Sequence, residues 1–88
     1  LVISKRHVSS FYSLNKLEQD ECWRLVNKVR EMLKEDFQAD GFNIGINLGE
    51  AAGQTVLHTH IHIIPRYVGD VANPRGGVRH VINGKGYY

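Results

Sequence analysis

The sequence has little of several features that would point to particular classes of protein. Its one cysteine, Cys22, excludes an internal disulfide bond and any zinc finger built on cysteines, and it suits a reducing compartment. No apolar run reaches the length that spans a membrane, and no stretch resembles a signal peptide. The formal net charge of +2 is too small to indicate binding to nucleic acid or to an anionic membrane. We therefore expect a cytoplasmic protein.

Eighty-eight residues allow one small domain with a modest core. The composition, with 42% hydrophobic and 23% charged residues, is ordinary for a soluble globular protein. The chain begins with Leu1 rather than Met, so we expect it to be a fragment of a longer chain.

Residues 15–37 have the pattern of one long helix. Asn15 can cap it, and Glu18 follows at the spacing of a capping box. Neither Gly nor Pro interrupts the segment. Its apolar stripe at helical spacing comprises Leu25, Val29, Met32 and Leu33, with Cys22, Val26 and Phe37 nearby. We expect this stripe to pack in the core, with Cys22 as a packed side chain rather than a nucleophile.

Residues 42–48 alternate between apolar and polar positions, the pattern of a strand with one covered face. The apolar positions are Phe42, Ile44, Ile46 and Leu48, and the others are Asn43, Gly45 and Asn47. A short connector, residues 49–54, favours antiparallel pairing with the segment that follows. Such pairing would bring Asn47 beside the first half of that segment.

Three histidines, His58, His60 and His62, stand at alternate positions in a segment rich in Val, Ile and Thr, which favour strands. Alternate residues of a strand point to one face, so the imidazoles would form a row with about 7 Å between neighbours. The opposite face would carry Leu57, Thr59, Ile61 and Ile63. The pattern thus predicts an antiparallel sheet with a polar floor, and a helix that covers its apolar face.

Three interpretations of the histidine row follow from imidazole chemistry. Neutral imidazole is a common zinc ligand, although three in line fit a tetrahedron poorly and a fourth ligand would have to come from another strand. Alternatively, one histidine attacks as a nucleophile while its neighbours orient it or protonate the leaving group. The third interpretation is a solvated polar face, which three histidines beside a glycine-rich turn make the least expected.

The tripeptide Gly53-Gln54-Thr55 lies directly before the row and predicts a phosphate-binding lip. Glycine lets backbone N–H groups approach an anion closely, and Gln54 and Thr55 add side-chain donors. Two basic segments, residues 5–7 and 74–79, would either attract phosphate as well or be solvated loops.

The segment from His58 to Ile64 has the form His-x-His-x-His followed by two apolar residues. Its lead-in, residues 49–56, and its exit, residues 65–70, match the same pattern. The sequence thereby resembles the histidine triad (HIT) superfamily, and it is most similar to the small bacterial HIT hydrolases related to diadenosine polyphosphate hydrolases. The resemblance covers essentially the whole chain from Leu1. It implies a single HIT domain, residues 1–88, that lacks the N-terminal segment of the family.

The resemblance implies an α+β fold, with one long helix on the apolar face of an antiparallel sheet, and a nucleotide hydrolase or transferase activity. Such an enzyme cleaves the bond between a nucleoside α-phosphate and a leaving group, in a dinucleoside polyphosphate or a nucleoside phosphoramidate. His60 would attack and form a phosphohistidine, its ring oriented by the His58 backbone, with His58 and His62 as the other catalytic histidines. The implied substrate-binding residues are Asn47, Gly53, Gln54, Thr55, Val56 and His62.

The same resemblance implies no required cofactor and no resident metal, although a divalent cation can accompany a polyphosphate substrate. The partners would be a small-molecule nucleotide and a second copy of the chain, with no nucleic acid and no membrane. A homodimer would cover the apolar residues Phe11, Tyr12 and Trp23. Two alternatives stay open: a non-catalytic nucleotide-binding module, and a zinc-binding module that uses the three histidines.

Overall fold

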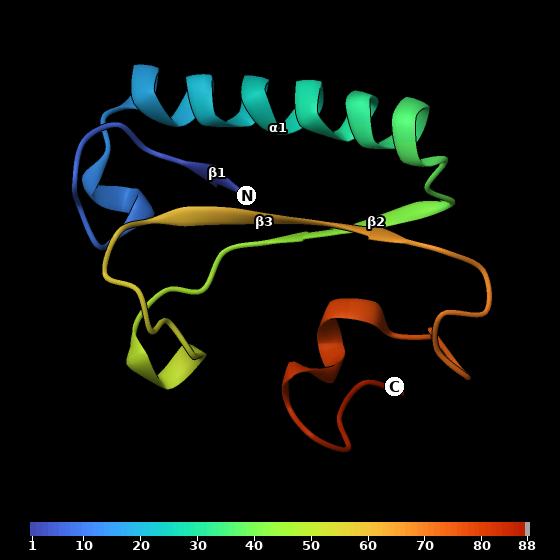
Figure 1. Cartoon of the computed structure of the whole chain (residues 1–88). Helices are drawn as coiled ribbons and strands as arrows, with labels where there is room; N and C mark the ends of the chain where they lie inside the picture. The colour runs from blue at the N-terminus through green and yellow to red at the C-terminus, as the bar shows by residue number, and fades with distance from the viewer. Residues whose placement is uncertain (88) are drawn as a thin grey trace.

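The computed structural model describes residues 1–87, so the expected domain end at Tyr88 lies outside the described residues. The regular elements are strand β1 (Val2–Ile3), helix α1 (Lys16–Phe37), strand β2 (Gly41–Gly45) and strand β3 (His60–Arg66). Short 3-10 helices named η1, η2 and η3 occupy Phe11–Ser13, Glu50–Ala52 and Gly77–Val81. Figure 1 shows α1 lying along one side of the sheet. This architecture confirms the predicted α+β class.

Local chemistry fixes both ends of α1. The Asn15 side chain accepts a hydrogen bond from the Glu18 N–H, and the Glu18 carboxylate accepts one from the Asn15 N–H, each at 2.9 Å. This reciprocal pair is the predicted capping box. At the other end Gln38 adopts a left-handed conformation, with φ of 53°, which stops the helical repeat. The helix predicted over residues 15–37 is therefore confirmed. In residues 1–87 no helix combines the length and apolar character needed to cross a membrane.

The sheet formed by residues 1–87 is antiparallel, with the order β1-β3-β2, so the strand that carries His60 and His62 is central. Ile3 of β1 lies opposite His60, and Gly45 of β2 lies opposite His62. A central strand is held in register by neighbours on both sides. The predicted antiparallel pairing of β2 with the histidine segment is confirmed.

The core lies between α1 and the sheet. Ile61 is 1% exposed, and with Ile63 it belongs to one buried cluster that includes Cys22 and Val26 of α1. Burial, followed by nearby carboxylates, raises the pKa of the Cys22 thiol, as expected for a packed side chain. The apolar stripe on α1 is narrower than the sequence predicted. Its exposed members are Leu25, Met32 and Phe37.

Strand β2 is shorter than the alternating pattern predicted, because it ends at Gly45 instead of Leu48. The chain then turns through η2, which Gly49 and Gly53 flank with φ of 88° and 87°. A positive φ favours glycine, and it interrupts an extended strand from Gly49 onward. The two glycines therefore convert the expected strand end into a compact loop.

Strand β3 begins at His60, so the prediction that all three histidines lie in one strand is wrong for His58. The residue between them, Thr59, donates its N–H to the Val8 carbonyl at 2.8 Å rather than to a neighbouring strand. This contact with the loop after β1 takes His58 out of the regular ladder.

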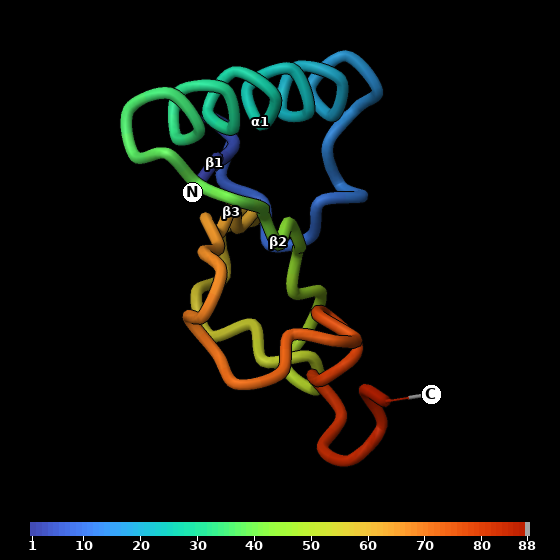
Figure 2. Tube along the Cα trace, turned by 90° about the vertical axis from the view of Figure 1, so that its right-hand side faces the viewer, coloured from blue at the N-terminus to red at the C-terminus, as the bar shows by residue number. Residues whose placement is uncertain are grey.

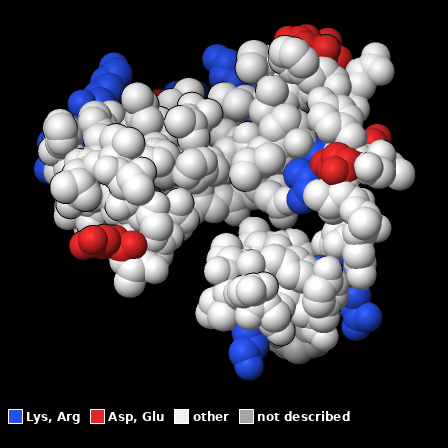
Figure 3. Space-filling view, turned by 60° about the horizontal axis from the view of Figure 1, so that its bottom comes forward, with Lys and Arg blue, Asp and Glu red and all other residues white. Residues whose placement is uncertain are grey.

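The side of the sheet that faces away from α1 carries η2 and the C-terminal tail, residues 67–87. Figures 1 and 2 agree in placing these two segments together below the sheet. Within the tail, η3 contacts β2. Figure 3 shows this side largely free of charged side chains, with the tail set apart by a hollow.

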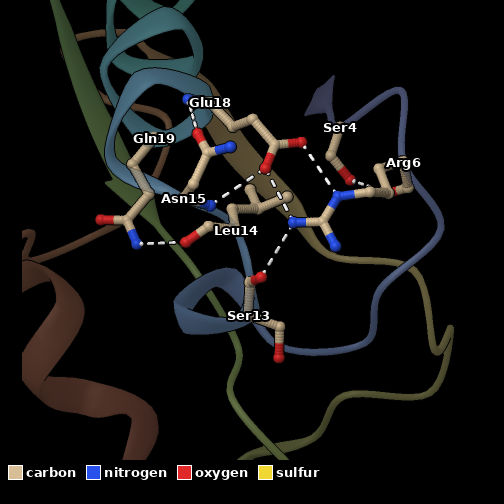
Figure 4. A network of polar contacts seen from close by, with 7 residues as sticks. All are labelled: Ser4, Arg6, Ser13, Leu14, Asn15, Glu18 and Gln19. Atoms are coloured by element: carbon tan, nitrogen blue, oxygen red, sulfur yellow. Dashed lines mark hydrogen bonds and ion pairs between the residues drawn. The ribbon is translucent and has the colours of Figure 1, made fainter.

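An ion pair ties the start of α1 to the loop after β1 (Figure 4). Arg6 donates through Nε and Nη2 to the two carboxylate oxygens of Glu18, at 3.2 and 2.7 Å, and through Nη2 to the Ser13 carbonyl at 3.0 Å. The bond from Arg6, followed by that from the Asn15 N–H, lowers the pKa of Glu18 to about 2. Glu18 therefore stays ionised through most of the acid range.

This lowered pKa predicts a pH-dependent stability. Glu18→Gln keeps an acceptor for the capping box but removes the charge. A carboxyl whose pKa falls on folding stabilises the protein above its unfolded value, near 4.5, and that contribution is lost as the pH falls through about 2. Above a pH of about 4.5, we expect the unfolding temperature of the wild type, measured by circular dichroism, to exceed that of Glu18→Gln. The difference should close toward pH 2, and a difference independent of pH would contradict the assignment. Glu35→Gln, on the same helix, is the matched control.

Candidate active site

His60, at the start of β3, has one ring nitrogen held by a backbone carbonyl. Its Nδ1 lies 2.8 Å from the backbone oxygen of His58. A carbonyl oxygen can only accept, so Nδ1 carries the proton and Nε2 of the neutral ring keeps its lone pair. This is the contact that the resemblance led us to expect. The ring is therefore held in the tautomer that leaves Nε2 ready to attack an electrophile.

The ring of His58 turns toward the loop after β1. Its Nε2 lies 2.6 Å from the Ser4 carbonyl, to which it donates. The ring centre lies 4.7 Å from that of His7, whose own Nε2 is 3.2 Å from the Leu57 carbonyl. His58 therefore contacts His60 through its backbone oxygen, and a catalytic role for its side chain stays a prediction.

His62 lies beside the proposed nucleophile. The ring centres of His60 and His62 are 4.9 Å apart, and the rings meet edge to face. Among the described residues, Nε2 of His62 is buried and has no hydrogen-bond partner. A buried polar atom without a partner costs free energy, so the site has an unused hydrogen-bonding position next to His60.

Gln54 is buried, 6% exposed, and its side-chain amide shapes the loop between β2 and β3. The amide oxygen accepts from the Gly49 N–H at 2.9 Å, and the amide nitrogen donates to the Ser9 and Val56 carbonyls at 2.7 and 3.2 Å. Both ends of the amide are thus used within the protein. The direct contact with phosphate predicted for Gln54 stays a prediction, whereas its role in holding the loop is visible.

The remaining residues predicted to bind substrate lie along the same loop. They are Asn47, Gly53, Thr55 and Val56. All are exposed. The register that pairs Gly45 with His62 directs Asn47 toward the end of β3 that bears His60. Asn47 and Thr55 are therefore the exposed side-chain donors of this loop.

A hollow of about 750 Å3 lies between β2, η2 and η3, and it separates the C-terminal tail from this loop. Asn47 and Gly53 line the hollow on the side of the loop. The tail lines it with Val78, Val81 and Ile82. This placement is compatible with the predicted folding of residues 74–79 over the site, but the wall that the tail provides is apolar.

The sequence interpretation missed the segment that supports the histidines, residues 4–9, which we call the cradle. Its backbone carbonyls accept hydrogen bonds from the His58 ring, from the Thr59 N–H and, through Ser9, from the Gln54 amide. Every residue has a carbonyl, so no side-chain pattern could have identified these acceptors. The basic residues 5–7 were the signal, and the sequence suggested phosphate contacts or a solvated turn for them.

Backbone carbonyls use some of the ring nitrogens of the histidines. Among residues 1–87 no three His, Cys, Asp or Glu side chains converge on a common point. His58 directs Nε2 at the Ser4 carbonyl, and His60 directs Nδ1 at the His58 carbonyl. Each of these two rings therefore has a single nitrogen that is not hydrogen-bonded to the backbone.

Comparison with known proteins places this geometry in context. A family model described as HIT domain matches residues 1–69. The bis(5'-adenosyl)-triphosphatase of Dictyostelium discoideum is 41% identical over 73 residues, which cover 83% of this chain and 49% of the relative. The chain thus spans about half the length of such curated relatives.

Solved structures agree with the sequence comparison. The NitFhit protein of C. elegans superposes with a TM-score of 0.75 at 34% identity, covering 90% of this chain and 19% of that chain. A zinc-bound histidine triad family protein from Mycobacterium smegmatis superposes with a TM-score of 0.72 at 33% identity, covering 81% of this chain and 52% of that chain.

Proposed function

The chain belongs to the HIT domain family, and on that premise we propose that it is a nucleotide hydrolase with His60 as its nucleophile. The substrate is a nucleoside α-phosphate bonded to a leaving group, as in a dinucleoside polyphosphate or a nucleoside phosphoramidate. The relative named bis(5'-adenosyl)-triphosphatase favours the first of these classes.

One observation carries the proposal, the 2.8 Å contact between Nδ1 of His60 and the His58 carbonyl. An imidazole attacks phosphorus through an unprotonated nitrogen, and this contact leaves Nε2 unprotonated. When Nε2 bonds to phosphorus, the ring becomes cationic, and the same Nδ1–H···O=C hydrogen bond then involves a charged donor. Hydrogen bonds from charged donors are stronger than neutral ones, so the His58 carbonyl favours the intermediate over the free ring.

The reaction has two balanced steps. In the first, Nε2 forms a bond to the α-phosphorus while the bond from phosphorus to the leaving group breaks. A polyphosphate departs with the bonding electron pair as an anion, and an amine departs after it takes a proton from solvent. In the second, a water oxygen attacks the phosphorus, the P–N bond breaks, and its electron pair returns to Nε2. One proton of the water goes to solvent, and the products are a nucleoside monophosphate and the regenerated enzyme. Two easier steps thus replace one difficult displacement.

Fixed hydrogen-bond donors stabilise the charge that develops on the phosphate oxygens. We propose that Nε2 of His62, which has no hydrogen-bond partner among the described residues, donates to one of these oxygens. Thr55 and Asn47 are exposed on the adjoining loop, and Gly53 leaves its backbone accessible. Gln54 would act mainly by holding this loop. The histidine chemistry requires no cofactor, and a divalent cation would enter as part of a polyphosphate substrate.

The proposal is tested by assaying the full-length protein against diadenosine polyphosphates and adenosine phosphoramidates, each with and without EDTA. We expect release of the nucleoside monophosphate from at least one class. Nucleotide binding without turnover of any substrate would overturn the proposal in favour of a non-catalytic module. Stoichiometric zinc binding at micromolar concentration, with activity removed by the chelator, would favour the zinc-binding alternative.

A homodimer and a cytoplasmic location are parts of the same proposal. Tyr12 and Trp23 are 73% and 45% exposed, which leaves apolar surface for a second copy to cover, whereas Phe11 is already buried. The reduced Cys22 suits the cytoplasm. Sedimentation of the 88-residue chain at micromolar concentration should give twice its mass of 10.0 kDa. A monomer alone would contradict the dimer.

A further inference from the structure

The cradle, residues 4–9, holds the segment before β3 at several points. The Ser4 carbonyl accepts from the His58 ring at 2.6 Å, and the His7 ring packs 4.7 Å from the His58 ring. The Val8 carbonyl accepts from the Thr59 N–H at 2.8 Å. These contacts join parts of the chain about fifty residues apart, so the position of the cradle decides where the catalytic segment lies.

One peptide unit links the position of the cradle to the ring of His60. The carbonyl that accepts from Nδ1 of His60 belongs to His58, and the N–H of the same planar peptide is that of Thr59. The bond from this N–H to Val8 therefore sets the direction in which the His58 carbonyl points. It also polarises the peptide, which strengthens the carbonyl as an acceptor. The tautomer of His60 thus depends on the position of the cradle.

A side chain of the cradle anchors it to the most regular part of the fold. Arg6 bonds both carboxylate oxygens of Glu18 and the Ser13 carbonyl, and its own backbone carbonyl accepts from the Ser4 hydroxyl at 2.7 Å and from the Val8 N–H at 3.1 Å. Figure 4 shows the guanidinium reaching from the loop to the first turn of α1. Glu18 is itself fixed by the capping box, so the anchor point is rigid.

We propose that Arg6, paired with Glu18, is a positioning residue that fixes the cradle and through it the His58 carbonyl and the reactive tautomer of His60. Among the described residues, the guanidinium of Arg6 bonds Glu18 and Ser13 and none of the three histidines of the row. Its effect passes through Ser4 and Val8, whose carbonyls hold the two sides of His58. This inference rests on the proposed role of His60 as nucleophile, and it assigns the loop after β1 a part in the reaction.

The geometry distinguishes this ion pair from an ordinary surface pair. Exposed pairs usually contribute little, but a two-point contact between arginine and a carboxylate fixes orientation as well as distance. Lysine has no planar fork and could not bond both oxygens of Glu18 and the Ser13 carbonyl in the same way. The role therefore calls for arginine rather than for any positive charge.

The test compares four single variants and one double variant of the full-length protein. Arg6→Gln and Arg6→Lys break the fork, and Glu18→Gln removes the carboxylate but leaves an acceptor for the cap. Arg24→Gln is the matched control, because it removes a similar two-point pair, between Arg24 and Glu21, that lies wholly within α1. For each variant, nitrogen-15 NMR of the histidine rings reports the tautomer of His60, and kinetics report kcat and KM separately.

We expect the wild type and Arg24→Gln to show His60 protonated at Nδ1, and Arg6→Gln and Arg6→Lys to show a mixture of tautomers. The same two variants should lose about tenfold to a hundredfold in kcat, with KM changed little, because misplacement affects the reacting geometry more than binding. The double variant Arg6→Gln/Glu18→Gln should be no worse than Arg6→Gln alone, since both changes break one interaction.

Two results would overturn the inference. One is an unchanged His60 tautomer in Arg6→Gln and Arg6→Lys, and the other is an equal effect of Arg24→Gln. Circular dichroism at the assay temperature separates unfolding from misplacement, and the milder Arg6→Lys serves if Arg6→Gln unfolds. A wild type that hydrolyses no nucleotide would refute the proposed function, whereas the NMR comparison would still decide whether Arg6 positions His60.

Discussion

His60→Ala is expected to lower turnover by several orders of magnitude while nucleotide binding stays largely intact. The imidazole forms the covalent bond to phosphorus, and no neighbouring group can replace it. His60→Asn should behave in the same way, because the amide is not a nucleophile of comparable strength. Steady-state kinetics on the preferred substrate measure the loss, and calorimetry with a non-hydrolysable nucleotide measures the binding.

Three neighbouring variants calibrate this effect. His62→Ala and Thr55→Ala each remove one hydrogen bond to a charged oxygen, so each should cost about 2–3 kcal/mol of transition-state stabilisation. His58→Ala should fall between these and His60→Ala, because its backbone carbonyl survives while its ring loses the Ser4 contact. Equal damage from all three histidine substitutions, together with loss of activity on chelation, would instead indicate a metal site.

The largest expected effect on stability comes from Ile61→Ala. Ile61 is 1% exposed and lies near the start of β3, opposite Val2 and in the cluster formed with α1. Truncating a fully buried isoleucine removes its burial and leaves a cavity, which costs about 2–5 kcal/mol. Since a domain of this size has roughly 5–15 kcal/mol of total stability, a large part would be lost. Urea denaturation would measure this loss of stability, provided that the slope of unfolding free energy against urea concentration is unchanged.

Ile64→Ala is the matched control, because the same residue type on the same strand is 48% exposed there. We expect a change within about 1 kcal/mol at this position. If the two variants are equally stable, the core does not lie where β3 faces α1.

The helix could be predicted closely because its signals are local. Asn15 and Glu18 are neighbours in sequence and form the cap between themselves. The width of the buried stripe on α1 was harder to predict, since the sequence does not show how wide a sheet lies against the helix. Met32 belongs to the predicted stripe but faces solvent. The core face of β3 was also recoverable, because Ile61 and Ile63 alternate with the histidines.

The contacts that support the site could not be predicted, because they are not local in the sequence. His58 lies before the strand, and its ring bonds Ser4, 54 positions away, through a backbone carbonyl. Gln54 is marked in the sequence as a donor to phosphate, but burial turns its amide toward Ser9 and Gly49. Such roles depend on which backbone groups the fold brings together, and side-chain identity alone does not reveal them.

The central claim is that His60 bonds covalently to the α-phosphorus, and trapping that bond tests it most directly. The full-length protein is mixed with a diadenosine polyphosphate labelled at the α-phosphate, quenched within a single turnover under denaturing conditions that preserve P–N bonds, and mapped by mass spectrometry. We predict a nucleotidyl group on His60 in the wild type and none in His60→Ala. A label that persists in His60→Ala, or its absence from His60 in a wild type that is turning over substrate, would contradict the account.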